Sequence, residues 1–286
     1  MIPTEGHHGD HLVHHRLLVR LRPPAHRAPP GPRRPCGRDR AAAQALDDLR
    51  EQAGDRLWTA PFDVTDAGQA RRVTAAAFAA LGPIDVIVSN AGYGVLASVE
   101  EAADEQIRRV IDTNLLGSIN VIRAALPHLR AQGHGRILQV SAAGGQAAYP
   151  YFGFYIAAKW GIEGFCETAA REVAPFGIGL TIIEPGATPT GFGAAVDTAP
   201  AMAEYDGTPA GEVRRALADG AFTFPNDPEK VAAAMIDLVD SGATPLRRTL
   251  GSDAYDDVHA ALSARLTELE QQRDLAFSVV NDAATA

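Results

Sequence analysis

Three polar residues in the middle of the chain have types and spacings that suit proton transfer: Ser141, Tyr155 and Lys159. Tyr155 and Lys159 are four residues apart in a stretch of helical character, so their side chains share one face of the helix. Tyrosine alone is a poor acid or base at neutral pH because its reference pKa is about 10. A nearby ammonium lowers that pKa, provided that the electrostatic gain exceeds the desolvation that raises it.

Ser141 ends an apolar segment, where its hydroxyl could hold a carbonyl group against Tyr155. Together these groups suit the reduction of a carbonyl. A Tyr-x-x-x-Lys pair by itself is common by chance, and the alternative is a surface tyrosine beside a solvated lysine.

Three further motifs favour the catalytic interpretation, because each follows an expected strand. They are Asp63-Val64, the run from Ser89 to Gly94 with Asn90, Ala91 and Gly92, and the run Pro185-Gly186-Ala187-Thr188-Pro189-Thr190. Open parallel sheets bind their ligands at the carboxyl ends of the strands. The three motifs therefore predict one ligand site.

These residues must be positioned by alternating helices and short apolar strands, which from residue 41 onward predict a single doubly wound α/β domain with a parallel sheet. The expected helices cover residues 42–52, 66–81, 103–131 (bent near Asn114), 155–174, 228–240 and 255–273. The expected strands cover residues 56–60, 84–89, 136–141 and 179–184, and residues 185–225 are broken by Gly and Pro.

With Asn114 and the fourteen-residue spacing from Ser141 to Tyr155, the motifs resemble the short-chain dehydrogenase/reductase family, Rossmann-like oxidoreductases, over about residues 42–260. The resemblance implies that Tyr155 is the catalytic acid/base and that Ser141 orients the substrate. It implies that Lys159 binds the nicotinamide ribose and tunes Tyr155. Asn114 would hold a proton-relay water near Lys159.

The resemblance also implies a nicotinamide dinucleotide and, as substrate, a secondary alcohol or ketone. Asn90, Ala91 and Gly92 would pack on the adenosine side of this cofactor, and Asp63 and Val64 would contact its adenine. The backbone of the loop after the next strand would contact the nicotinamide carboxamide, through Pro185, Gly186, Thr188 and Thr190. Residues 190–225 correspond to a mobile substrate lid in the family, with ordinary loop packing as the alternative. The apolar side chains there favour a hydrophobic ketone. A homo-oligomer is also expected from the resemblance.

Residues 1–40 depart from the family. They hold eight Arg against three acidic residues, and the family's first strand and its loop Thr-Gly-x-x-x-Gly-x-Gly, which admits the pyrophosphate, are missing or disrupted in this chain. We interpret this segment as irregular and residues 41–286 as the Rossmann-like domain.

The codon table offers an explanation for this departure. The chain has 24 Arg and two Lys, as expected from a GC-rich gene. Shifted by one base, a CGG Arg codon becomes a Gly codon and a CAC His codon becomes a Thr codon. In the shifted frame, His15 can be read as Thr, and Arg16, Arg20 and Arg22 can be read as Gly. These are the four defined positions of the family's loop. Our hypothesis is that residues 7–40 are an out-of-frame translation, and a genuine basic arm is the alternative.

Composition narrows the function classes. With 286 residues, 46% hydrophobic and 21% charged, the chain is globular, and a net charge of −9 argues against nucleic acid and anionic membranes as partners. No apolar run is long enough to span a membrane and no export signal is visible, so we expect a cytoplasmic protein. Cys36 and Cys166 make no disulfide framework, and no metal site is expected.

Hydride transfer is therefore the expected function. The rival is a non-enzymatic binding or scaffold protein that keeps the sheet but has lost cofactor affinity. An epimerase or dehydratase is disfavoured, because the long sugar-nucleotide domain of such enzymes has no room here. The shifted sequence cannot encode Asp at the end of the second strand, which favours NADP over NAD.

Overall fold

A parallel sheet forms the centre of the computed structural model, which describes residues 57–280. The segment 1–40 and the expected helix 42–52 lie outside the described residues. The sheet has four strands in the order β1-β3-β4-β6. Their bounds are β1 Val86–Ser89, β3 Gly135–Val140, β4 Ile178–Pro185 and β6 Arg247–Leu250. Neighbouring strands are parallel, with Ile87 opposite Ile137 and Ile137 opposite Leu180.

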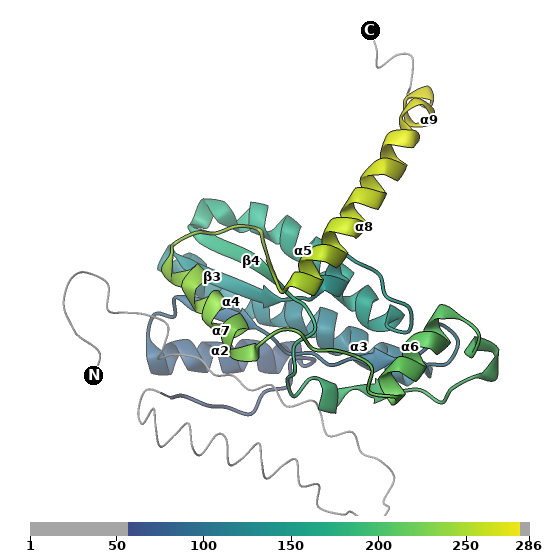
Figure 1. Cartoon of the computed structure of the whole chain (residues 1–286). Coiled ribbons are helices and arrows are strands. Elements are labelled where there is room, and N and C mark those ends of the chain that lie inside the picture. Colours follow the sequence, from purple (N-terminus) through teal and green to yellow (C-terminus); the bar gives the residue numbers. More distant parts are fainter. Residues whose placement is uncertain (1–56, 281–286) are drawn as a thin grey trace, which may run out of the picture.

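Helices cover both faces of this sheet (Figure 1). Ile137 and Ile182 belong to an apolar cluster with α2 (Ala67–Leu81), α4 (Ser118–Gln132) and α5 (Gly153–Val173). The next residue on each strand, Leu138 or Ile183, packs instead with Leu238 of α7 (Pro228–Asp240). Because successive side chains of a strand point to opposite faces, the two clusters lie on opposite sides of the sheet. The expected doubly wound α/β fold is confirmed.

Local capping signals set the helix ends where the sequence predicted them. The Asp66 carboxylate accepts a hydrogen bond from the Gln69 amide at 2.9 Å at the start of α2, and Gly82, with φ 75°, ends that helix. Asp227 caps α7 in the same way, ahead of Pro228. Such caps satisfy backbone donors that have no partner inside the helix. The expected helices 66–81, 155–174 and 228–240 are therefore confirmed to within a few residues.

The long helix expected over residues 103–131 is interrupted where the bend was predicted. It consists of α3 (Asp104–Ile111), a π-helical turn over Asp112–Gly117 and α4. Asn114 lies in the wide turn and is completely buried. A Cβ at Gly117 would lie 2.7 Å from Val64 Cγ2, so only glycine lets the turn approach Val64.

The observed elements differ from the expected ones in four places. Residues 57–60 form no strand, because a strand needs a pairing partner and, within residues 57–280, β1 pairs only with β3. The sequence analysis missed β6, whose two arginines hide its strand character. It also missed α6 (Pro209–Ala218). The last expected helix begins earlier and is divided into α8 (Ser252–Gln271) and α9 (Arg273–Ser278).

The segment expected as a lid is joined to residues 94–110 by backbone and ionic contacts. β5 (Asp197–Thr198) pairs with β2 (Val95–Leu96), and Arg109 forms an ion pair with Asp197 at 2.5 Å. The fully buried Glu101 carboxylate accepts hydrogen bonds from the amides of Ser98 (2.7 Å) and Met202 (2.9 Å). It also accepts one from the Arg214 guanidinium of α6 at 2.8 Å. These contacts hold the base of the segment.

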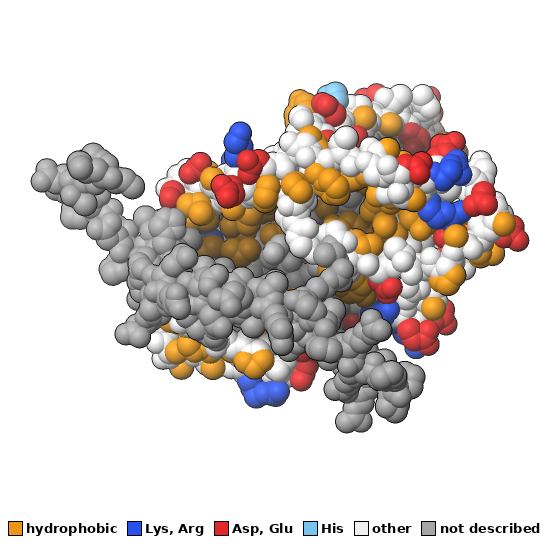
Figure 2. All heavy atoms as spheres, turned by 60° about the horizontal axis from the view of Figure 1, so that its bottom comes forward, with side chains coloured by type: hydrophobic (Ala, Val, Ile, Leu, Met, Phe, Trp, Pro, Cys, Tyr) orange, Lys and Arg blue, Asp and Glu red, His pale blue; other side chains and the backbone are white. Residues whose placement is uncertain are grey.

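The surface combines apolar and charged regions. Figure 2 shows apolar side chains gathered in the middle of one face, with acidic and basic side chains around its rim. Within residues 57–280, no helix is both long and apolar enough to cross a lipid bilayer.

We expect Glu101→Ala to destabilise the segment from Asp197 to Ala218. The change leaves the buried amides of Ser98 and Met202 without an acceptor, which costs about 2 kcal/mol or more. Chemical denaturation would measure this loss, and hydrogen exchange would locate it. Glu100→Ala is the matched control, because Glu100 is exposed and, among residues 57–280, accepts a hydrogen bond only from the Tyr205 hydroxyl. Equal stability of the two variants would contradict the prediction.

Candidate active site

Helix α5 presents Tyr155 and Lys159 toward the carboxyl end of β3. Lys159 is buried, and its ammonium donates a hydrogen bond to the Val140 carbonyl at 2.9 Å. Lys159 Nζ also lies 5.6 Å from the centroid of the Tyr155 ring. The structure therefore brings together the two residues whose spacing suggested proton transfer, and the last residue of β3 fixes the lysine.

Desolvation dominates the electrostatics of this pair. Burial raises the pKa of the Tyr155 phenol above its ordinary value. Burial lowers the pKa of Lys159 to about 8, although the Glu163 carboxylate acts in the opposite direction. Both shifts favour the neutral form of the group, as expected when charges leave water. The lowering of the tyrosine pKa by the ammonium, considered from the sequence, is the smaller effect in the described chain.

Ser141 is also buried, but its hydroxyl is directed toward a residue that the sequence analysis did not single out. Ser141 Oγ donates a hydrogen bond to Glu163 Oε1 at 2.6 Å. A Cβ at Gly145 would overlap the Glu163 carboxylate and lie 2.6 Å from Ser141 Oγ, so this contact requires glycine at position 145. Among the described residues, the structure shows no hydrogen bond between Ser141 and Tyr155.

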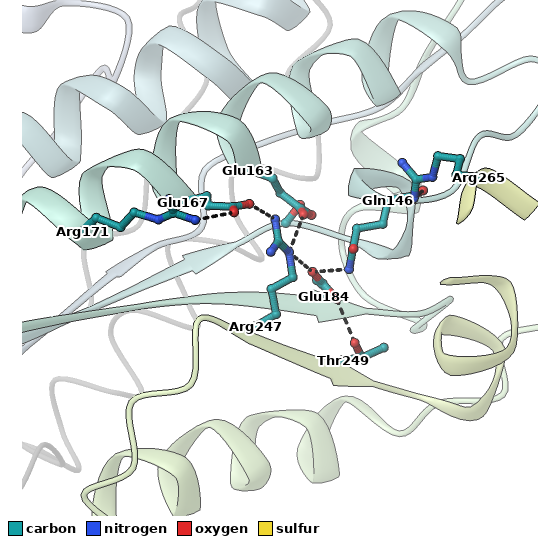
Figure 3. A network of polar contacts seen from close by, with 9 residues as sticks. Gln146, Glu163, Glu167, Arg171, Glu184, Arg247, Thr249 and Arg265 are labelled. Atoms are coloured by element: carbon teal, nitrogen blue, oxygen red, sulfur yellow. Dashed lines mark hydrogen bonds and ion pairs between the residues drawn. The ribbon is translucent and has the colours of Figure 1, made fainter. Parts of the chain in front are cut away.

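Glu163 belongs to a polar network between α5 and the sheet, shown in Figure 3. The Arg247 guanidinium of β6 lies 3.3 Å from Glu163, 3.2 Å from Glu184 and 3.0 Å from Glu167. Glu184, which is fully buried on β4, also accepts hydrogen bonds from Gln146 and Thr249, both at 2.8 Å. One guanidinium thus faces three carboxylates.

The excess of carboxylates over guanidinium groups contributes to a raised pKa of Glu163. Burial raises the pKa of Glu163 to about 7, and the neighbouring Glu184 carboxylate adds to the shift, while Ser141 and Arg247 oppose it. Sequence analysis missed Glu163, although a signal was present. It lies eight residues after Tyr155 and four after Lys159, so all three are close to one face of the helix.

Asn114 connects the π-helical turn to the loop after β1. Its Oδ1 accepts from the Tyr93 amide at 3.1 Å, and its Nδ2 donates to the Tyr93 carbonyl at 2.8 Å. A Cβ at Gly92 would lie 3.2 Å from Asn114 Oδ1. The loop carrying Asn90, Ala91 and Gly92 is therefore held against Asn114 at the carboxyl end of the sheet.

Asp63 and Val64 occupy a tight turn beside α4. Asp63 Oδ1 accepts from both the amide (2.9 Å) and the hydroxyl (2.7 Å) of Thr65. Val64 is buried, and its carbonyl accepts from Asn120 Nδ2 at 2.9 Å. This turn thus contributes mainly backbone to the candidate site.

The loop after β4 brings an aromatic residue to the catalytic pair. Thr188 Oγ1 donates to the Gly186 carbonyl at 3.0 Å, and Thr190 Oγ1 accepts from the Phe192 amide at 3.3 Å. The Phe192 ring meets the Tyr155 ring edge to face, with 5.5 Å between the centroids. Pro185 ends β4, so the whole motif begins where the strand ends. The arrangement places an apolar wall beside the tyrosine.

Cys166 is not part of this site. It is completely buried, and burial raises the pKa of its thiol to about 12. Cys166 therefore packs as a small apolar residue.

Comparison with known proteins agrees with the fold. The family model described as "short chain dehydrogenase" matches residues 35–201. Oxidoreductase BOA17 of Botryotinia fuckeliana is 31% identical over 236 residues, which cover 82% of this chain and 86% of that protein. The chain therefore belongs to the short-chain dehydrogenase/reductase family, whose members are NAD(P)-dependent oxidoreductases.

Solved structures extend the comparison. A short-chain dehydrogenase from Streptomyces avermitilis is 34% identical, with a TM-score of 0.76 over 83% of this chain and 87% of that one. An alcohol dehydrogenase from Thermococcus sibiricus, complexed with 5-hydroxy-NADP, has a TM-score of 0.58 at 23% identity over 74% of this chain and 81% of that one. The second likeness shows the shared fold.

We expect the stability of the protein to fall as the pH rises from about 5 to 8. A carboxyl with a raised folded pKa binds more protons folded than unfolded, so its ionisation above pH 4.5 costs stability until the pH passes about 7. Glu163→Gln removes this titration while keeping an acceptor for Ser141. The variant should be more stable than the original protein at pH 8 by roughly 3 kcal/mol.

Urea denaturation at several pH values would measure this difference. Glu167→Gln is the control, since Arg247 lowers the pKa of the more exposed Glu167. If Glu163→Gln and the original protein lose stability in parallel between pH 5 and 8, then Glu163 is not the titrating group.

Proposed function

We propose that the protein transfers a hydride between a nicotinamide dinucleotide and a secondary alcohol or ketone, with Tyr155 as the acid/base. One observation carries the proposal: Tyr155 and Lys159 share one face of α5, and the Val140 carbonyl fixes the lysine ammonium 5.6 Å from the tyrosine ring. In reduction, the Tyr155 hydroxyl donates its proton to the substrate oxygen. Its raised pKa keeps that proton in place until the oxygen becomes basic.

The described residues fit the nicotinamide dinucleotide. A Cβ at Gly92 would lie 3.2 Å from Asn114 Oδ1, so glycine suits this tightly packed position and leaves the loop backbone bare for a ligand to approach. Ser89 Oγ, buried at the end of β1, has no hydrogen-bond partner in the described chain. When bound, the cofactor supplies or accepts the hydride. Asp63, Val64, Asn90, Ala91 and Gly92 would hold its adenosine side, and Pro185, Gly186, Thr188, Thr190 and Lys159 its nicotinamide side.

Ser141 and Asn114 have supporting roles in this proposal. Ser141 would orient the substrate oxygen. Its hydrogen bond to Glu163 determines whether the serine hydroxyl can donate to that oxygen or only accept from it. While Glu163 is ionised, the serine proton points to the carboxylate, so the serine oxygen can only accept. Asn114 would position a proton-relay water near Lys159 from the buried π-helical turn.

A hydrophobic ketone or alcohol is the proposed substrate class. Phe192 forms an apolar wall against Tyr155, and Val196 of the same segment lies against Gly94.

NADP is the proposed cofactor in preference to NAD. We propose that the enzyme is a homo-oligomer in the cytoplasm. The competing function is a scaffold without cofactor affinity, and a titration with NADPH and NADH distinguishes the two, because only the enzyme binds at micromolar concentrations.

We expect Tyr155→Phe to lower kcat at least 100-fold, because it removes only the ionisable hydroxyl. Lys159→Ala should lower kcat and also weaken cofactor binding. Steady-state kinetics against a panel of ketones, with circular dichroism as a check of folding, would test both. Retention of more than about a tenth of the turnover in Tyr155→Phe would rule out the assignment.

The hypothesis of an out-of-frame amino-terminal segment predicts a gain of function. Replacing residues 7–40 by the shifted sequence, with His15→Thr, Arg16→Gly, Arg20→Gly and Arg22→Gly, should raise the melting temperature and tighten NADPH binding at least tenfold. Single Arg→Gly changes should do neither, because the neighbouring strand and helix sequence is still shifted. Fluorescence titration of both proteins measures the effect. Equally tight binding by the unchanged chain would contradict the hypothesis.

A further inference from the structure

The loop after β4 is held by side chains from two distant segments. The Ala187 amide donates a hydrogen bond to Asp253 Oδ2 at 2.7 Å. Asn226 Nδ2 donates to the Ala187 carbonyl at 3.0 Å and to Asp253 Oδ1 at 2.8 Å. Both backbone groups of Ala187 are thus bound by side chains, and these side chains also bind each other.

Packing around these contacts leaves no free space. A Cβ at Gly186 would overlap the Asp253 carboxylate. Gly251 has φ 121°, and a Cβ there would lie 2.6 Å from Asn226 Oδ1 and 2.7 Å from Asp253 Oδ1. The Gly186 amide donates to the Leu250 carbonyl of β6 at 2.8 Å. Two glycines therefore permit the close contact of the loop, Asn226 and the first turn of α8.

The same helix also contacts a residue beside Tyr155. One turn after Asp253, Asp257 Oδ2 accepts a hydrogen bond from the Tyr149 hydroxyl at 2.7 Å. A Cβ at Gly144 would lie 3.7 Å from the Tyr149 ring and 3.8 Å from the Tyr155 ring, so both rings border Gly144. The first two turns of α8 thus contact two sides of the candidate site.

We propose that Asp253 and Asn226 are positioning residues, which fix the backbone of Gly186 and Ala187 so that the loop can receive the nicotinamide side of the cofactor. This inference rests on the proposed function. Neither residue belongs to the motifs that suggested the site. Their action is indirect, through the Ala187 amide and carbonyl.

A carboxylate suits this task for two reasons. It can accept from the Ala187 amide and from Asn226 at the same time, one bond to each oxygen. It also lies in the first turn of α8, where the helix dipole stabilises a negative charge. Removal of the carboxylate leaves the Ala187 amide without a partner and Asn226 with one bond fewer.

The test compares Asp253→Ala with Asp256→Ala, an exposed aspartate in the same helix turn. Without cofactor, hydrogen exchange of the peptide covering residues 184–190 should become at least tenfold faster in Asp253→Ala and stay unchanged in Asp256→Ala. Asp253→Asn keeps one acceptor for the amide and should restore most of the protection. If Asp253→Ala does not fold, Asn226→Ala decides the question, because it removes the side-chain donor to the Ala187 carbonyl and should also make exchange of this peptide faster.

Cofactor binding gives the second measurement. Asp253→Ala should raise the Kd and the KM for NADPH about tenfold, while kcat changes less than threefold and the KM for the ketone stays constant. Asn226→Ala should show the same pattern more weakly. A purely structural role would lower the amount of active protein without this separation of KM from kcat.

Two results would overturn the proposal. One is unchanged exchange of residues 184–190 in Asp253→Ala, which would show that the carboxylate does not hold the loop. The other is faster exchange with unchanged NADPH affinity, which would show that the loop position does not matter to the cofactor. If the original protein neither binds NADPH nor turns over a ketone, the proposed function fails, and with it the cofactor role of Asp253.

Discussion

The structure depends on how one arginine balances three carboxylates between the sheet and its longest covering helix. Arg247 comes from β6, Glu184 from β4, and Glu163 and Glu167 from α5. Burying a carboxylate without a partner is costly, so these contacts tie the two strands and the helix together. The surplus of negative charge is relieved by donors from Ser141, Gln146 and Thr249 and by the raised pKa of Glu163. This network acts together with the apolar contacts of Ile162 and Cys166 to hold α5 against the sheet.

The catalytic pair is positioned by the same helix. Lys159 is one turn before Glu163, and it reaches the Val140 carbonyl while Glu163 reaches the adjacent Ser141. Both contacts come from one continuous helix of 21 residues, so a shift of α5 would move both. The Glu163 carboxylate partly offsets the lowering of the Lys159 pKa by burial. The glutamate supports the charged form of the lysine, and the arginine supports that of the glutamate.

The sequence predicted the parallel sheet, the covering helices and the bend near Asn114, because periodicity and helix caps are local signals. It did not predict β6, whose Arg247 and Arg248 make the segment polar, and whose strand character depends on pairing with Ile182 and Ile183. At the site, the four-residue spacing was sufficient to predict that Tyr155 and Lys159 lie close together on one helix. The direction of the Ser141 hydroxyl was not predictable, because it depends on a glutamate 22 residues away and on the space left by Gly145.

The π-helical turn at Asp112–Gly117 sets how the buried faces of α3 and α4 are oriented relative to each other. Its i→i+5 hydrogen bonds accommodate one residue more than an α-helical turn does. Loss of that residue would let α3 and α4 join as one ordinary helix, with a complete set of backbone hydrogen bonds. Asn114 would then rotate away from Tyr93. The buried faces of α3 and α4 would also turn by about 100° relative to each other, so a single-codon deletion would disturb the packing of Val110 or Ile122 together with the contact of Asn114.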